Sequence, residues 1–77
     1  MTELASAPLN ETDRAVLSEM ADRERHNAPE LAALTNADRN YINTRLRHLA
    51  SWELVEAVEH SRGMYTISDR GHEVVES

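Results

Sequence analysis

The sequence contains no cysteine, so neither a disulfide framework nor a thiolate metal site can brace the fold, and nothing indicates an oxidising compartment. The histidines, at positions 26, 48, 60 and 72, are scattered without an i, i+4 pair, and we therefore expect no metal site. With only two glycines, the chain has no glycine-rich loop to hold a phosphate. These absences predict a protein without a cofactor.

Long uncharged stretches are also missing. No run approaches the length of a membrane span, and residues 1–3 lack the basic start of a signal peptide, so we expect a cytoplasmic protein without a membrane partner. A chain of 77 residues makes one domain and buries only about 60% of its unfolded surface. A core of this size can hardly support a catalytic pocket of several hundred cubic ångströms, and we expect no enzyme.

Charge is distributed unevenly along the chain. Fourteen acidic residues against eight basic ones give a formal net charge of −6, which by itself argues against a polyanionic partner. Between positions 31 and 52, however, Asp38 is the only acidic residue, whereas Arg39, Arg45 and Arg47 are basic. This segment is therefore locally positive.

All eight basic residues are arginine, and the chain has no lysine. Together with the acidic excess, this composition resembles that of proteins from salt-loving archaea, with chance in a short chain as the alternative. In molar salt, charge is screened over about 3 Å. A net charge of −6 would then repel DNA much less than it does in dilute buffer.

The order of the expected elements follows from periodicity and capping signals. Residues 1–8 carry no periodic pattern, and we interpret them as a flexible arm before a single domain of residues 9–77. Three helices are predicted, over residues 10–25, 28–34 and 37–50. Their apolar residues at helical spacing, expected to face inward, are Val16, Leu17, Met20, Leu31, Leu34, Ile42, Leu46 and Leu49.

Short polar residues stand at the start of each predicted helix. Asn10 is a suitable N-cap for the first helix, with Asp13 at the third position. Asn27 is the expected cap of the second helix, and Glu30, three residues on, can complete a capping box. Asn36 is the expected cap of the third helix.

The period of the pattern changes after the third helix. Residues 54–58 and 64–67 are β-prone, and the residues between them favour a hairpin turn in which Gly63 is free to take a positive φ. A short helix over about residues 68–76 follows, weakened by Gly71. The chain is therefore expected to end in a two-stranded ribbon and a short helix.

Three helices with a tight turn between the second and third, followed by a hairpin, indicate an α+β winged helix-turn-helix fold. The segments that support a closer comparison are ELAALT (30–35), RNYINTRLRHL (39–49), LV (54–55) and YTISDRG (65–71). Over about residues 10–76, the chain resembles the winged helix-turn-helix repressors of archaea, most closely the halophilic archaeal phage-repressor type. One departure is Trp52-Glu53, which stands where such sequences commonly place a glycine.

The third predicted helix has a polar face opposite its apolar stripe, at about 100° per residue. This face consists of Asn40, Thr44 and Arg47, flanked by Tyr41, Asn43 and His48. Asparagine can bond bidentately to adenine, arginine can pair with guanine, and a threonine methyl can contact the thymine methyl in the major groove. A merely solvated face is the alternative, although such faces are more often filled with glutamate and lysine. We therefore expect this helix to contact base edges.

Other residues are candidates for contacts to the DNA backbone. Arg39 and Arg45 lean toward the groove edges and suit phosphate contacts, with an ion pair to a nearby carboxylate as the alternative. Asn36 lies at a helix N-terminus, where a phosphate is attracted, although capping alone is its other role. Arg62 at the hairpin tip can reach a phosphate or the flanking minor groove, or stay unengaged. Trp52 is expected to close the core, with a dimer contact as the alternative.

The resemblance and the polar face together predict a transcriptional regulator, a repressor, that binds specific double-stranded DNA. One module of this size buries limited surface on DNA, so we expect a homodimer on paired half-sites. Residues 68–76 and the arm before Pro8 are its candidate interface. The alternative is a winged-helix module for protein contact, whose acidic surface binds a basic partner; the net charge favours it, and the acid-poor third helix favours DNA. No small-molecule ligand is evident.

Overall fold

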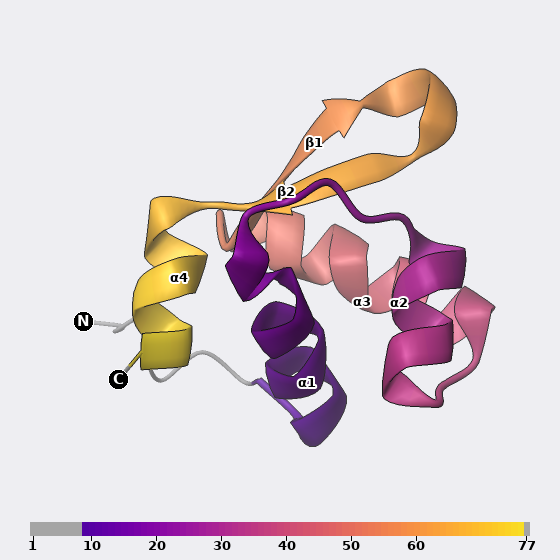
Figure 1. Ribbon diagram of the computed structural model, residues 1–77, viewed down its shortest axis with the longest axis horizontal. Coiled ribbons are helices and arrows are strands. Elements are labelled where there is room, and N and C mark those ends of the chain that lie inside the picture. Colours follow the sequence, from indigo (N-terminus) through magenta and orange to yellow (C-terminus); the bar gives the residue numbers. More distant parts are fainter. Residues whose placement is uncertain (1–8, 77) are drawn as a thin grey trace.

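The computed structural model describes residues 9–76, apart from the side chain of His60; the expected flexible arm, residues 1–8, lies outside them. The elements in chain order are α1 (Glu11–Glu19), η2 (Met20–Asp22), α2 (Ala28–Thr35), α3 (Arg39–Ser51), β1 (Val55–Glu59), η3 (His60–Arg62), β2 (Met64–Ile67) and α4 (Asp69–Glu76). Figure 1 shows the hairpin projecting from the helices, with α4 beside α1 at one end and α2 at the other. The predicted α+β winged-helix arrangement is confirmed.

Apolar side chains from the first three helices and both strands meet in one core. Its fully buried members include Val16, Leu17, Met20, Leu31, Ile42, Leu46, Leu49 and Leu54. The prediction for Leu34 is wrong, because this side chain is 50% exposed. The buried stripe of α2 is formed by Ala28, Leu31 and Ala32, and Leu34 lies about 100° around the helix from the middle of that stripe.

Helix α1 begins as predicted and ends earlier than predicted. Asn10 and Asp13 form the full capping box: the Asn10 side chain accepts from the Asp13 backbone N–H at 2.8 Å, and the Asp13 carboxylate accepts from the Asn10 N–H at 3.0 Å. The α-helix ends at Glu19, continues as the 3₁₀ turn η2, and stops where Arg23 takes a left-handed φ of 65°. The chain then leaves helical geometry before residue 25.

The turn between α2 and α3 uses its polar residues differently from the prediction. Asn27 caps α2, accepting from the Glu30 N–H at 2.9 Å. Asn36, however, ends α2 in a left-handed conformation with φ 55°, and Asp38 is the cap of α3, accepting from the Tyr41 N–H at 3.0 Å. The prediction that Asn36 caps α3 is therefore wrong. Asparagine tolerates left-handed geometry as readily as it caps helices, so its presence does not distinguish the two roles.

An isolated backbone bridge joins the hairpin to the loop before α2, and the sequence did not reveal it. β1 and β2 pair antiparallel, with an irregularity between Ala57 and Glu59, and Gly63 takes the expected positive φ of 63°. His26, in the loop before α2, pairs with Tyr65 of β2 through two backbone hydrogen bonds of 2.8 Å each. The loop between η2 and α2 is thereby attached to the hairpin.

Two backbone features shape the C-terminal part of the domain. Glu53, where the resemblance leads one to expect glycine, takes a left-handed φ of 64°, and the next N–H, of Leu54, closes the end of α3 on the Leu49 carbonyl at 2.9 Å. A Cβ at Gly71 would lie 2.1 Å from the Leu54 carbonyl oxygen, so glycine permits the close packing of α4. No helix within residues 9–76 is long and apolar enough to cross a membrane.

Candidate nucleic-acid interface

The outward face of α3 is open in the structure. Asn40, Thr44 and Arg47, the residues expected to contact base edges, are all exposed, and so is Asn43 beside them. The Thr44 hydroxyl donates to the Asn40 carbonyl oxygen at 3.1 Å, which leaves the hydroxyl oxygen available as an acceptor. Within residues 9–76, the chain therefore leaves this polar face available to a partner.

Two flanking residues of this face also make contacts within the domain. The Tyr41 hydroxyl accepts from the Asn10 side-chain amide at 2.8 Å, which ties α3 to the cap of α1. The His48 ring stacks on Trp52, with centroids 5.8 Å apart, and Trp52 packs against the core as expected. Tyr41 and His48 remain exposed, but their positions are fixed by these neighbours.

Arg45 belongs to the inside of the domain. Its Nε donates to Asp13 Oδ1 at 2.8 Å and its Nη2 donates to Asp13 Oδ2 at 2.6 Å, while the Asp13 side chain is fully buried and that of Arg45 is 16% exposed. The hydrogen bonds to Asp13 raise the pKa of Arg45 above its already high ordinary value. Of the two alternatives for Arg45, the ion pair is the one present, and we remove Arg45 from the candidate DNA contacts.

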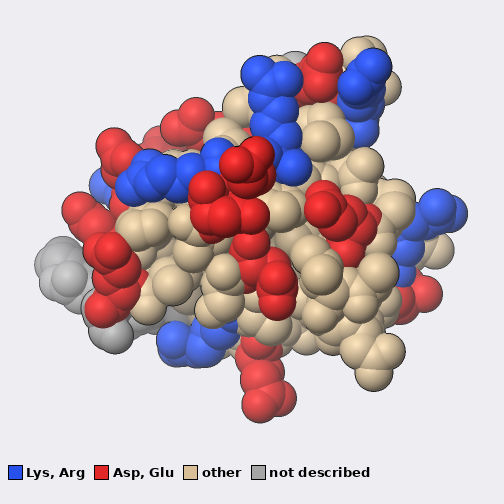
Figure 2. All heavy atoms as spheres, in the orientation of Figure 1, with Lys and Arg blue, Asp and Glu red and all other residues tan. Residues whose placement is uncertain are grey.

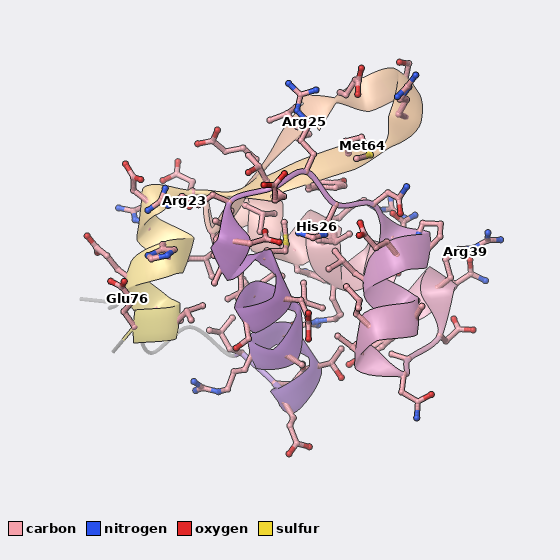
Figure 3. All side chains as sticks on the ribbon, viewed as in Figure 1. Arg23, Arg25, His26, Arg39, Met64 and Glu76 are labelled. Carbon is pink, nitrogen blue, oxygen red and sulfur yellow. The ribbon has the colours of Figure 1, made fainter. Side chains whose placement is uncertain are left out.

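The start of α3, the start of α2 and the hairpin tip enclose one shallow depression of about 270 Å³. Its lining residues are Asn27, Ala28, Pro29, Arg39, Asn40, Asn43, Arg62 and Gly63. Two arginines and three amides thus face one space, and none of these lining residues is acidic. The sequence placed Arg39 on a helix and Arg62 on a turn, but only the fold brings them together. Figure 3 shows Arg39 projecting outward.

The carboxylates next to this lining in the sequence are both engaged. Glu30 follows Pro29 and accepts a hydrogen bond from the His26 ring, at 3.0 Å. Asp38 precedes Arg39 and caps α3, accepting from a backbone N–H at 3.0 Å. Asn36, on the far side of the turn, is exposed and offers a side-chain amide near the start of α3.

One face of the domain is rich in carboxylates, with arginines among them. In the view of Figure 2, carboxylates are spread over the side that carries α1, α4 and the loop between η2 and α2. Within residues 9–76, no group of three or more histidine, cysteine, aspartate or glutamate side chains is arranged to hold a metal ion. The depression between α2, α3 and the hairpin therefore stands out by its basic and amide lining.

The fold and the site define an α+β domain of winged-helix arrangement, with a polar and basic surface on the third helix and hairpin tip. No protein-family model and no curated protein matches the sequence. The arrangement of the elements establishes the fold class.

Proposed function

We propose that this protein is a transcriptional regulator that binds specific double-stranded DNA, with α3 in the major groove and the hairpin tip on the flanking backbone or minor groove. The observation that carries the proposal is the depression that Arg39, Asn43 and Arg62 share, whose lining contains no acid although the molecule has a net charge of −6. Such a local exception in an acidic molecule is expected where a polyanion binds.

Different residues of this surface are assigned to base edges and to phosphates. Asn40, Thr44 and Arg47 supply the donors, acceptors and methyl group that distinguish base pairs in the major groove. Arg39 and Arg62 lie at the two sides of the depression and suit phosphate contacts, which position a protein without reading sequence. In this assignment, Arg45 holds α3 against α1.

The proposal includes a homodimer acting as a repressor. Two copies on paired half-sites provide the buried surface and specificity that one small module lacks. Within residues 68–76, Val75 packs partly against the domain's own core and is half-buried, so its exposed part is offered as a contact to a second copy. The other part of the candidate interface, before Pro8, lies outside the described residues.

The proposal is tested by selecting bound fragments from a random pool of duplex DNA, at 0.15 M and at multimolar potassium chloride. Enrichment of a palindrome is the expected result and would report specificity and dimer symmetry together. Failure of the wild-type protein to enrich any sequence at either salt concentration would overturn the proposal and favour a module that contacts a basic protein through its acidic surface.

Variants then assign the contacts on the selected DNA. The double variant Asn40→Ala with Arg47→Ala loses two bidentate contacts, each of which is expected to contribute about 1–3 kcal/mol. Its affinity should fall by about 30-fold or more, and its sequence preference should relax. Arg62→Ala should weaken binding to all sequences alike and reduce the slope of log affinity against log salt by about 1. Arg14→Ala, an exposed arginine on α1 away from α3 and the hairpin tip, is the matched control and should change neither the sequence preference nor the salt slope.

A further inference from the structure

His26 is buried between two carboxylates from different elements. Its Nε2 lies 3.0 Å from Asp22 Oδ1 and its Nδ1 lies 3.0 Å from Glu30 Oε1, while the His26 side chain is only 6% exposed. A neutral imidazole carries one N–H and can donate to only one carboxylate. Both contacts are favourable only when the ring is an imidazolium, whichever way the ring is turned.

The backbone of the same residue attaches the hairpin. His26 exchanges two hydrogen bonds with Tyr65 of β2, and the Thr66 hydroxyl donates to the carbonyl oxygen of Arg23 at 3.4 Å, three residues earlier in the loop. The three residues that follow His26, 27–29, line the depression with Arg62. His26 therefore stands at the junction of η2, α2 and the hairpin (Figure 3), next in the chain to residues that line the depression.

Of the charged groups near His26 within residues 9–76, only the carboxylates of Asp22 and Glu30 pair with its ring. Asp22 comes from η2, Glu30 from α2, and Tyr65 of β2 contacts His26 through its backbone. The arginines beside it in the loop pair elsewhere, Arg23 with Asp69 and Arg25 with Glu59. Burial alone would lower the pKa of His26, but the hydrogen bonds to Asp22 and Glu30 outweigh it and raise the pKa above the ordinary 6.5. The same bond with His26 is the main cause of a lowered pKa at Asp22.

We infer that His26 is a proton-dependent link: its imidazolium holds the hairpin beside the start of α2, and loss of the proton loosens this attachment. The consequence for DNA rests on the proposed function. The cluster of His26, Asp22 and Glu30 carries one net negative charge when the ring is protonated and two when it is neutral. Deprotonation therefore adds negative charge beside the depression and loosens Arg62 at the same time, and both effects weaken the binding of a polyanion.

The sign of the pH dependence follows from these directions. Because the pKa of His26 is raised in the folded state, its stabilising contribution is complete below the unfolded value of about 6.5 and is lost as the pH rises through the folded value. On the acid side, the contribution of Asp22 is lost as the pH falls below about 4, since its pKa is lowered on folding. The attachment is strongest between these limits.

The first test needs no DNA. The His26 ring is titrated by NMR, and the exchange of the Tyr65 amide is measured at pH 5.5 and 8.5, corrected for intrinsic exchange and compared with core amides such as that of Leu46. The Tyr65 amide should lose protection by about tenfold for each pH unit by which His26 titrates above 6.5. A ring that titrates at or below 6.5, or equal protection of the Tyr65 amide at both pH values, overturns the inference.

Variants separate the link from general stability. Glu30→Gln and Asp22→Asn remove one charge each and should bring the titration of His26 closer to 6.5. His26→Gln should make the corrected protection of the Tyr65 amide the same at both pH values. His72→Gln is the matched control, since His72 pairs with Glu76 on α4 at 3.3 Å, away from the hairpin attachment. It should leave the pH response of the Tyr65 amide unchanged, and a response lost equally in this control overturns the assignment to His26.

The second test measures binding of the selected duplex at pH 5.5 and 8.5. Wild-type affinity should fall at the higher pH, because the cluster beside the depression becomes more negative, and the affinity of His26→Gln should fall less over the same pH range. An unchanged wild-type affinity despite a confirmed amide response overturns the regulatory part. A protein that binds no DNA at either pH contradicts the proposed function and leaves the proton-dependent link to be judged by the first test.

Discussion

Replacing Arg45 by methionine removes the cation from a buried ion pair while keeping most of the side chain's length. Asp13 is fully buried, and Arg45 supplies donors to both of its oxygens, so the variant leaves the carboxylate with the Asn10 backbone N–H. Breaking a buried pair in this way costs about 3–5 kcal/mol. A domain of 77 residues is expected to have a free energy of unfolding of roughly 4–12 kcal/mol in total. The variant should therefore lose a large part of its stability.

The loss is measured by urea denaturation, followed by the fluorescence of Trp52, the chain's single tryptophan. Because the Arg45 guanidinium lies 5.8 Å from the Trp52 ring centroid, the native signal itself will change, and circular dichroism serves as the second probe. The midpoint of thermal unfolding should fall by on the order of 12–40 °C, since 1 kcal/mol shifts a domain of this size by about 4–8 °C.

Arg47→Met is the control on the same helix. Arg47 is exposed, and a surface substitution of this kind is expected to change the free energy of unfolding by no more than about 0.5 kcal/mol. Its effect should instead be on DNA binding. If Arg45→Met leaves stability within 1 kcal/mol of wild type and weakens DNA binding as Arg47→Met does, the assignment of Arg45 to the interior is refuted. The double variant Asp13→Leu with Arg45→Met should recover part of the lost stability, because an apolar pair can replace a buried ion pair, although leucine cannot accept from the Asn10 backbone N–H.

Three further substitutions test the backbone, by the same urea measurement. Gly71→Ala places a methyl group 2.1 Å from the Leu54 carbonyl oxygen and should cost about 1–3 kcal/mol or more by overpacking; an unchanged stability would contradict the close approach. Glu53→Val should cost about 1–2 kcal/mol, because a β-branched residue is strained at φ 64°, whereas Glu53→Gly should be nearly neutral. Asn10→Ala removes the side-chain half of the capping box with Asp13 and should cost about 0.5–2 kcal/mol.

Local signals in the sequence were sufficient for most of the fold. The Asn10 and Asn27 caps, the apolar stripe of α3 and the turn glycine Gly63 each act within a few residues, and the structure confirms each one. Asn36 was misassigned because the same side chain suits a cap and a left-handed helix end. Which of these two roles Asn36 takes depends on the length of the turn between α2 and α3, and the packing of the two helices sets that length.

Contacts between residues far apart in the sequence were the part that the sequence did not predict. The pairing of His26 with Tyr65 joins residues 39 positions apart, and no periodic pattern predicts it. The ion pair between Arg45 and Asp13, by contrast, could have been predicted from the sequence. Asp13 shares a helical face with Val16, Leu17 and Met20, so its carboxylate is expected to be buried with them. A buried carboxylate requires a cation as its partner. An arginine on an adjacent helix was the available partner.

The net charge of −6 does not decide whether DNA binds, because electrostatic interactions in salt are short-ranged. The molecule extends 34 Å along its longest axis, and α4, with three acidic residues, lies at the opposite end from α2 (Figure 1). The Debye length is about 8 Å at physiological ionic strength and about 3 Å at 1 M. A phosphate in the depression is therefore attracted mainly by Arg39 and Arg62. The nearest carboxylates in the sequence, Glu30 and Asp38, already accept hydrogen bonds from the His26 ring and from the Tyr41 N–H. Salt removes the repulsion from distant carboxylates first, and the direct contacts in the depression decide the affinity that remains.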